Sequence, residues 1–242
     1  MRGPLLSAAA RRALAGLLLL SLAACAGPEA RAKELYRKGQ VLFSQGDAEK
    51  ALHHFRESLE LTQALGLQEG SASNHHAIAL VHIRRKEHRA ALTHLTRALE
   101  LDRAREDEAS AASTLNDLAR LHLILGEPRK ALARYQEALA IDERLGRLVG
   151  AAIAHNNIGR IHLAQGAYGE AVQHFRASLA AFEKRRAALE EEAAAFEKEG
   201  KGKKAERARR RIQSLLDQED VVRRNLADAE KRRRYPPLKI SQ

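Results

Sequence analysis

Small and apolar residues recur along the chain with a period of 40 residues. Four alanines mark the repeat: Ala51, Ala91, Ala131 and Ala171. Each is followed four residues later by a large side chain: Phe55, Leu95, Tyr135 and Phe175. A small residue lies twelve positions before each alanine: Gly39, Ala79, Ala119 and Gly159. Apolar spacings of three and four indicate amphipathic helices, so the pattern predicts four helical hairpins over residues 32–182.

This arrangement resembles the tetratricopeptide repeat, in which a small residue of the first helix packs against an alanine and an aromatic residue of the second. The tryptophan position of that repeat instead holds Leu35, His75, Leu115 and His155. Its closing proline is replaced by Gln63, Arg103, Glu143 and Glu183. The period of 40 exceeds the usual ~34 residues and therefore predicts longer helices. It resembles the long-repeat variety found in peptide-binding scaffold and signalling proteins.

Two heptad seams follow the repeats and predict a charged helical hairpin over residues 183–235, with a tail at 236–242. Arg186 interrupts the first seam, Glu219 interrupts the second, and Gly200-Lys201-Gly202 separates them. An antiparallel hairpin is the simplest fold for this pattern, and an intermolecular coiled coil is the alternative. We therefore predict an all-α chain, a tetratricopeptide-like helical-hairpin solenoid followed by an antiparallel helical hairpin.

Residues 1–24 have the layout of a bacterial export signal, with Arg2, Arg11 and Arg12 preceding an apolar run too short to span a membrane. The sequence Leu22-Ala23-Ala24-Cys25 resembles the lipobox of bacterial lipoproteins. That resemblance implies cleavage before Cys25 and lipid attachment to its thiol, with residues 25–31 as a tether. It also implies a bacterial envelope protein, and Ala26 is typical of cargo for the inner leaflet of the outer membrane, facing the periplasm. A plain secretory signal is the alternative.

The composition is basic, with a formal net charge of +11 for 242 residues. An exported chain with this charge is expected to meet anionic lipid, cell-wall polymer or acidic proteins, and we expect no nucleic-acid partner. Two basic runs, residues 207–211 and 231–234, lie on the second arm of the expected hairpin. A solvated helix face is the default interpretation of these runs, and docking to an anionic surface is the alternative.

The residues do not assemble a recognisable catalytic or metal-binding motif. His82, His122 and His162 share one repeat position, but an intervening helix separates equivalent positions of successive repeats, too far for a shared metal ion. Cys25 is the single cysteine, which excludes an intramolecular disulfide. The sequence therefore predicts a chain that is not an enzyme and needs no cofactor or metal.

In tetratricopeptide domains the first helices line a concave groove. The groove positions implied by this resemblance are Tyr36, Gln40, His76, Leu80, Asn116, Arg120, Asn156 and Arg160. Asparagine amides suit a ligand backbone, since they both donate and accept hydrogen bonds, and the arginines favour carboxylates. The predicted function is a lipid-anchored, non-catalytic scaffold that binds an acidic or peptide-like segment of envelope proteins. The alternative is a structural protein whose basic hairpin contacts membrane, cell wall or a second copy.

Overall fold

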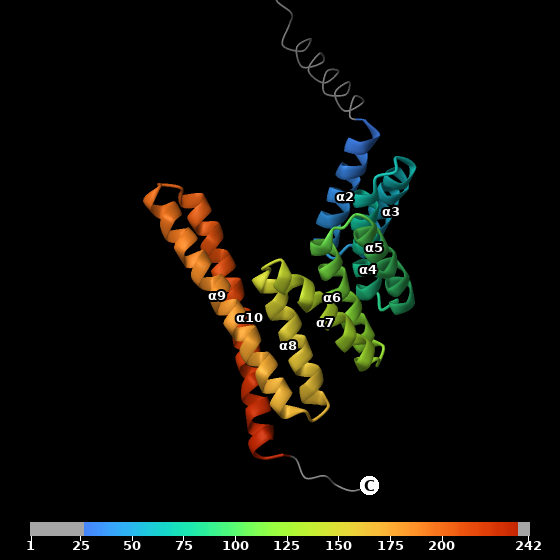
Figure 1. The fold of residues 1–242 in the computed structure, drawn as a ribbon. Helices are drawn as coiled ribbons and strands as arrows, with labels where there is room; N and C mark the ends of the chain where they lie inside the picture. Colours follow the sequence, from blue (N-terminus) through green and yellow to red (C-terminus); the bar gives the residue numbers. More distant parts are fainter. Residues whose placement is uncertain (1–26, 237–242) are drawn as a thin grey trace, which may run out of the picture. The chain divides into compact units, whose positions relative to one another are not determined.

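The computed structural model describes residues 27–236, so the expected export signal and Cys25 lie outside the described part of the chain. The described residues fold into α-helices connected by short turns (Figure 1). The helices are α2 (Pro28–Ser44), α3 (Ala48–Ala64), α4 (Gln68–Arg84), α5 (His88–Ala104), α6 (Glu108–Ile124), α7 (Pro128–Arg144), α8 (Leu148–Ala164), α9 (Tyr168–Lys198) and α10 (Gly202–Arg234).

The repeat period of 40 corresponds to two helices of 17 residues, each followed by a three-residue turn. Most of these turns place glycine in the left-handed conformation, as at Gly46 with φ 91°. Lys86 and Glu106 adopt that conformation instead in the two turns that lack glycine, with φ of 61° and 56°. The two turns without glycine therefore close in the same way as the others.

The first helix begins earlier than expected. We predicted a tether over residues 25–31, but α2 already starts at Pro28, with Gly27 as its N-cap. Proline suits this position because the first residues of a helix have no intrahelical partner for their N–H groups.

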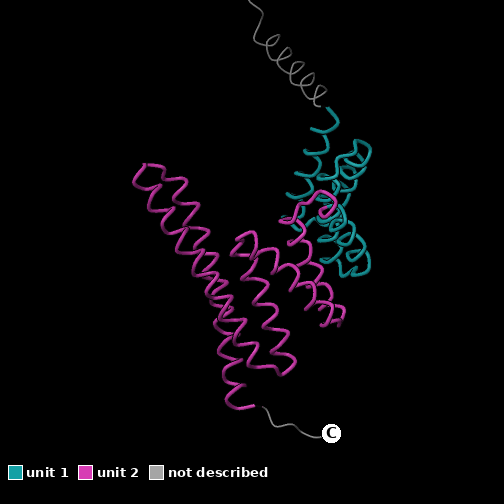
Figure 2. The backbone as a smooth tube through the Cα atoms, in the orientation of Figure 1, with its two compact units in different colours: residues 1–101 teal, residues 102–242 magenta. Residues whose placement is uncertain are grey.

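The chain divides into two compact units, residues 1–101 and 102–242, with the boundary inside α5 (Figure 2). In the first unit, α2 packs on α3 and α4. Its core includes Ala51, Phe55 and Ile78. A methyl group added to Gly39 would lie 2.6 Å from the Phe55 ring, so only glycine fits at this crossing. The predicted role of the small first-helix residue is confirmed here.

The second unit contains α6 to α10. Its repeat core brings Ala119, Ala131, Tyr135 and Ile158 together. Gly159 takes the place of Gly39, since a methyl group on it would lie 2.8 Å from the Phe175 ring. The same small-to-aromatic contact therefore recurs in both units.

The predicted antiparallel hairpin is confirmed. α9 continues without a break from the last repeat into the first arm, and α10 packs along it as the second arm. Four apolar residues of the seams, Leu189, Leu215, Val222 and Ala229, are buried in one core. The two seam interruptions meet, because Arg186 Nε donates to Glu219 Oε1 at 3.0 Å. α10 also contacts α8, a contact that the seams did not predict. Within residues 27–236, no helix is long and apolar enough to cross a membrane.

Candidate functional site

The expected groove residues lie on the first helix of each repeat. Tyr36 and Gln40 are on α2, and His76 and Leu80 are on α4, which contacts α2 in the first unit. Asn116 and Arg120 are on α6, and Asn156 and Arg160 are on α8, which contacts α6 in the second unit. Each unit therefore presents its expected residues from two neighbouring helices.

In the first unit, the side chain of Tyr36 makes its contacts within the chain. Its ring packs against Phe55 with centroids 5.5 Å apart, and its hydroxyl is hydrogen-bonded to Gln40. Burial raises the pKa of Tyr36 above its ordinary value. His76 and Leu80 are partly buried. This half of the expected set forms an aromatic and aliphatic surface with few exposed polar groups.

In the second unit, the two arginines lie on helices in contact, α6 and α8. Arg120 and Arg160 are exposed, and both guanidinium charges act on the hydroxyl of Tyr135, a residue of α7. Burial raises the pKa of Tyr135 to about 12, although both arginines favour its ionised form. Arg120 Nη2 also lies 3.0 Å from Asp117 Oδ1. Both cations thus act electrostatically on the same buried phenol.

The two asparagines differ, although the sequence places them at equivalent positions. Asn116 donates its amide to the Ala112 carbonyl at 3.0 Å, while its Oδ1 is buried without a hydrogen-bond partner. Asn156 Oδ1 accepts a hydrogen bond of 3.0 Å from Asn225 Nδ2 of α10. The acceptor of Asn156 is therefore occupied by the hairpin, and the expected ladder of free amides does not extend to α8.

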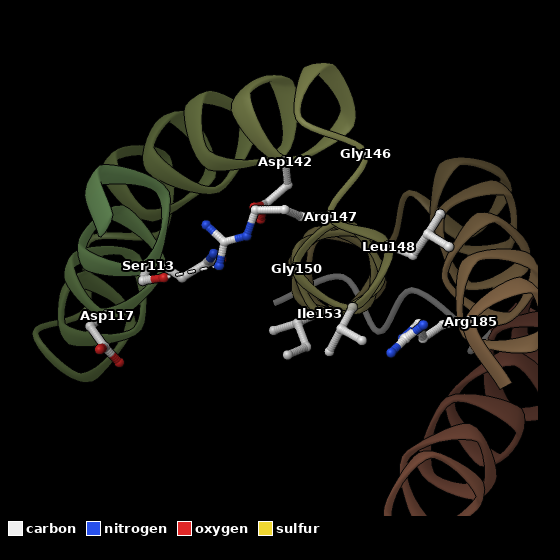
Figure 3. Close-up of a pocket in the computed structure, with 11 residues that line it drawn as sticks. Ser113, Asp117, Asp142, Gly146, Arg147, Leu148, Gly150, Ile153 and Arg185 are labelled. Carbon is white, nitrogen blue, oxygen red and sulfur yellow. Dashed lines mark hydrogen bonds and ion pairs between the residues drawn. The ribbon is translucent and has the colours of Figure 1, made fainter. Parts of the chain in front are cut away.

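A pocket with a volume of about 560 Å³ opens beside Asn116 (Figure 3). It is lined by α6, one residue of α7, the turn before α8, the first two turns of α8, and one residue of α9. The lining residues are Ser113, Asn116, Asp117, Asp142, Gly146, Arg147, Leu148, Val149, Gly150, Ile153 and Arg185. Of the residues expected from the sequence, Asn116 is the one that the pocket contains. We call it the α6–α8 pocket.

Asp142 is the most unusual residue of the α6–α8 pocket. Its side chain is 1% exposed, and neither of its oxygens accepts a hydrogen bond. Burial raises its pKa, and the charge of Arg147 opposes this change, with Arg147 Nε 3.4 Å from Oδ1. A methyl group on Gly150 would overlap the carboxylate, so glycine is required beside it. The sequence carried one sign of this unusual residue: Asp142 is charged, whereas the equivalent position of the next repeat holds the apolar Phe182.

The Arg147 guanidinium is directed across the pocket towards α6 (Figure 3). It donates to the Ala109 carbonyl and, at 3.3 Å, to Ser113 Oγ. These two bonds use Nη1 and Nη2, so Arg147 faces Asp142 through Nε, which forms an ion pair with Oδ1 but no hydrogen bond. The pocket combines a buried acceptor group with fixed cations near its rim.

Histidines form two equivalent clusters, one in each unit. His75 Nδ1 lies 2.9 Å from His94 Nδ1, and the His82 ring stacks on His94 with centroids 5.5 Å apart. The second cluster, His155, His162 and His174, repeats these contacts, with 3.0 Å between the Nδ1 atoms of His155 and His174. Burial lowers the pKa of both His94 and His174 to about 4.

The histidine set expected from the sequence is thus divided. His82 and His162 belong to different clusters, and His122 is bonded to Glu127 at 2.7 Å. Among residues 27–236, no three histidine, cysteine or acidic side chains are placed so that they could hold a metal ion.

Known proteins match this chain through its repeats. A family model described as tetratricopeptide repeat matches residues 31–104 and 110–184. No curated protein sequence gives a significant match.

Three solved structures are similar in fold. BtubC (BKLC) from P. vanneervenii is 20% identical with a TM-score of 0.59, over 88% of this chain and 90% of that one. Aspartyl phosphate phosphatase F from Bacillus subtilis is 13% identical with a TM-score of 0.63, over 78% of this chain and 60% of that one. A Rap protein complexed with Competence and Sporulation Factor is 21% identical with a TM-score of 0.56, over 79% of this chain and 55% of that one.

These identities establish the fold alone, and the chain spans little more than half of the phosphatase and the Rap protein. The family match covers more than half of the chain and includes all four predicted repeats. The chain belongs to the tetratricopeptide-repeat family, whose repeats serve as scaffolds for protein–protein interaction.

Proposed function

We propose that this chain is a non-catalytic scaffold of the bacterial envelope that binds a peptide segment or helix of a partner protein on α6 and α8. The observation that carries this proposal is the pair of exposed arginines, Arg120 and Arg160, on two helices in contact, α6 and α8. Two exposed guanidiniums on neighbouring first helices suit a ligand with carboxylates, because arginine binds them in a bidentate manner. The complex of a Rap protein with a bound factor supports the idea that this kind of fold holds ligands.

The double variant Arg120→Ala/Arg160→Ala tests the binding surface. Hydrogen bonds to charged groups contribute about 1.5–3 kcal/mol each, so partner affinity should fall by between one and several powers of ten. The loss should shrink as salt rises, since exposed ion pairs are screened over ~8–10 Å at physiological ionic strength. Partners would be captured by in-cell crosslinking from Ile153, an exposed residue beside the α6–α8 pocket, and identified by mass spectrometry.

The matched control is Arg207→Ala/Arg211→Ala, which removes the same charge from exposed positions of α10. Unchanged capture in this control, with loss in the α6–α8 variant, would support the proposal. Undiminished affinity of Arg120→Ala/Arg160→Ala would move the binding surface off α6 and α8.

The envelope location rests on the resemblance of residues 22–25 to a lipobox. Two or three acyl chains hold a protein at a membrane firmly, whereas one chain binds only marginally. Cys25→Ala should therefore abolish labelling by a fatty-acid analogue and leave a precursor that retains residues 1–24. Unchanged labelling of the variant would remove the lipoprotein assignment.

A second candidate function is structural. Both basic runs of α10, residues 207–211 and 231–234, are exposed except for Ala208, which is buried against α9. Such a surface suits anionic lipid, cell-wall polymer or a second copy of the chain. Loss of envelope attachment or self-association in Arg207→Ala/Arg211→Ala, with partner capture intact, would favour this alternative.

A further inference from the structure

Three buried acceptor oxygens line the α6–α8 pocket without hydrogen-bond donors: Asp142 Oδ1, Asp142 Oδ2 and Asn116 Oδ1. Buried polar groups in folded proteins nearly always have partners, because removal from water without one is costly. Two residues from different helices share this property in a single pocket. This coincidence indicates that the pocket is built to receive donors from outside the chain.

The preceding repeat shows how the same position is satisfied internally. Asp102 lies 40 residues before Asp142 and is equally buried, with 3% exposure. Its Oδ2 accepts a hydrogen bond of 3.1 Å from Thr114 Oγ1. The residue that corresponds to Thr114 in the next repeat is Ala154, which has no donor in its side chain. The repeat that contains Asp142 therefore retains the buried carboxylate but lacks the group that would satisfy it.

The cations that line the pocket do not supply the missing donors. The guanidinium of Arg147 donates to Ala109 and Ser113 on α6, as described above. Arg185 donates to Glu192 at 3.1 Å. Burial raises the pKa of Asp142 despite the nearby Arg147, as expected for a carboxylate with too few donors. What the pocket lacks is a group with several N–H bonds and a positive charge.

We propose that the α6–α8 pocket is a subsite for a primary ammonium group, presented by a lysine side chain of the partner segment. An ammonium carries three N–H donors, and the pocket holds three unsatisfied acceptor oxygens, on Asp142 and Asn116. Asp117 of the pocket pairs with Arg120 at 3.0 Å, so a partner segment that reaches the pocket would combine a cation with the carboxylates that Arg120 and Arg160 attract. This subsite rests on the proposed scaffold function and specifies the partner's chemistry.

The test uses n-butylammonium as the probe and the purified full chain, with backbone amide shifts followed by NMR. We expect saturable shifts at Asn116 and along residues 146–153. Tetramethylammonium carries the same charge without N–H donors and should bind about tenfold more weakly. The neutral 1-butanol should produce no saturable shift. Equal binding of n-butylammonium and tetramethylammonium would overturn the proposal, and so would the absence of saturable shifts.

Variants of the pocket residues test which side chains bind the probe. Asp142→Asn should weaken n-butylammonium binding about tenfold, because the buried negative charge is lost. Its matched control is Asp102→Asn, the equivalent position with an internal donor, which should bind the probe like the wild type. Asn116→Ala is a second variant for the case that Asp142→Asn does not fold, since the Asn116 amide bonds only to its own helix in the hydrogen bonds described here. Binding that is unchanged in a folded Asp142→Asn variant, or in Asn116→Ala, would refute the subsite.

The probe experiment needs no partner, whereas the scaffold is tested by capture of partners with the Arg120 and Arg160 variants. Undiminished capture by the Arg120→Ala/Arg160→Ala variant, with probe binding intact, would refute the scaffold face alone. Capture with no probe binding would refute the ammonium subsite alone.

Discussion

The ion pair between Arg186 and Glu219 joins the two arms of the hairpin. Replacement of one partner should lower the stability of the hairpin, whereas replacement of both should preserve or raise it. Glu219 is 2% exposed between the arms. It accepts from Arg186 at 3.0 Å and from Arg223, 52% exposed, at 3.3 Å. Loss of one partner leaves a buried charge that its remaining neighbour does not fully compensate. Replacement of both charges by leucine removes that cost and completes both apolar seams.

The burial of these residues gives the expected changes in the free energy of unfolding. Removal of one partner from a buried pair costs about 3–5 kcal/mol. Arg186 is 27% exposed and Arg223 remains in place, so Arg186→Leu should cost about 2 kcal/mol. The double variant Arg186→Leu/Glu219→Leu should be at least as stable as the wild type, and up to ~1–4 kcal/mol more stable. The control is Arg176→Leu, which breaks an exposed pair with Glu230 across the same two helices and should cost less than ~1 kcal/mol.

Hydrogen exchange of the α10 amides, read by mass spectrometry, suits this test because the two units need not unfold together. A cost of about 2 kcal/mol corresponds to roughly thirtyfold faster exchange in Arg186→Leu. The double variant should exchange as slowly as the wild type or more slowly. The reasoning is refuted if Arg186→Leu behaves like Arg176→Leu, or if the double variant exchanges faster than Arg186→Leu.

Three further predictions concern the repeats. Ala131→Leu should cost about 1–3 kcal/mol because Ala131 is fully buried at a helix crossing, whereas Ala133→Leu on the exposed face of α7 should leave the melting midpoint nearly unchanged; equal midpoints would contradict the repeat register. His94 and His174 have a pKa of about 4 in the folded chain and about 6.5 when unfolded, so the unfolded state takes up protons first. The free energy of unfolding should be highest above pH ~6.5 and fall towards pH ~4, by about 1–2 kcal/mol per ring after allowance for partial exposure. In melting experiments across this range, the midpoint of the variant His94→Asn/His174→Asn should depend less on pH. Ala154→Thr should raise the free energy of unfolding by about 0.5–1.5 kcal/mol, because its hydroxyl would donate to the buried carboxylate of the α6–α8 pocket. The melting midpoint should rise accordingly, and a lower midpoint would show that the two repeats are not equivalent there.

The repeat architecture could be predicted from the sequence because each repeat is a local unit. Contacts between Gly39 and Phe55, or between Gly159 and Phe175, join residues 16 apart on adjacent helices. Apolar residues three and four apart define such helices, and the small residue at each crossing identifies the partner face. The two heptad seams predicted the hairpin for the same reason. Two turns carry no glycine to mark them in the sequence, since Lys86 and Glu106 take the left-handed conformation there.

The candidate site was predicted less well, since equivalent sequence positions have different surroundings. Asn116 and Asn156 occupy the same place in successive repeats, yet Asn156 bonds to Asn225, 69 residues further along the chain. Asp102 and Asp142 are equivalent as well, but only Asp102 has a threonine beside it in these two repeats.

The sequence by itself determined the helices, their pairing into repeats and the antiparallel hairpin, because these follow from periodic spacing along one short stretch of chain. The tertiary structure alone decided that Arg186 pairs with Glu219, that α10 covers Asn156, and that the oxygens of Asp142 have no donors. The physical reason is that a hydrogen bond depends on atoms within about 3 Å. Those atoms come from helices distant in sequence, and a repeat period does not specify which of them meet.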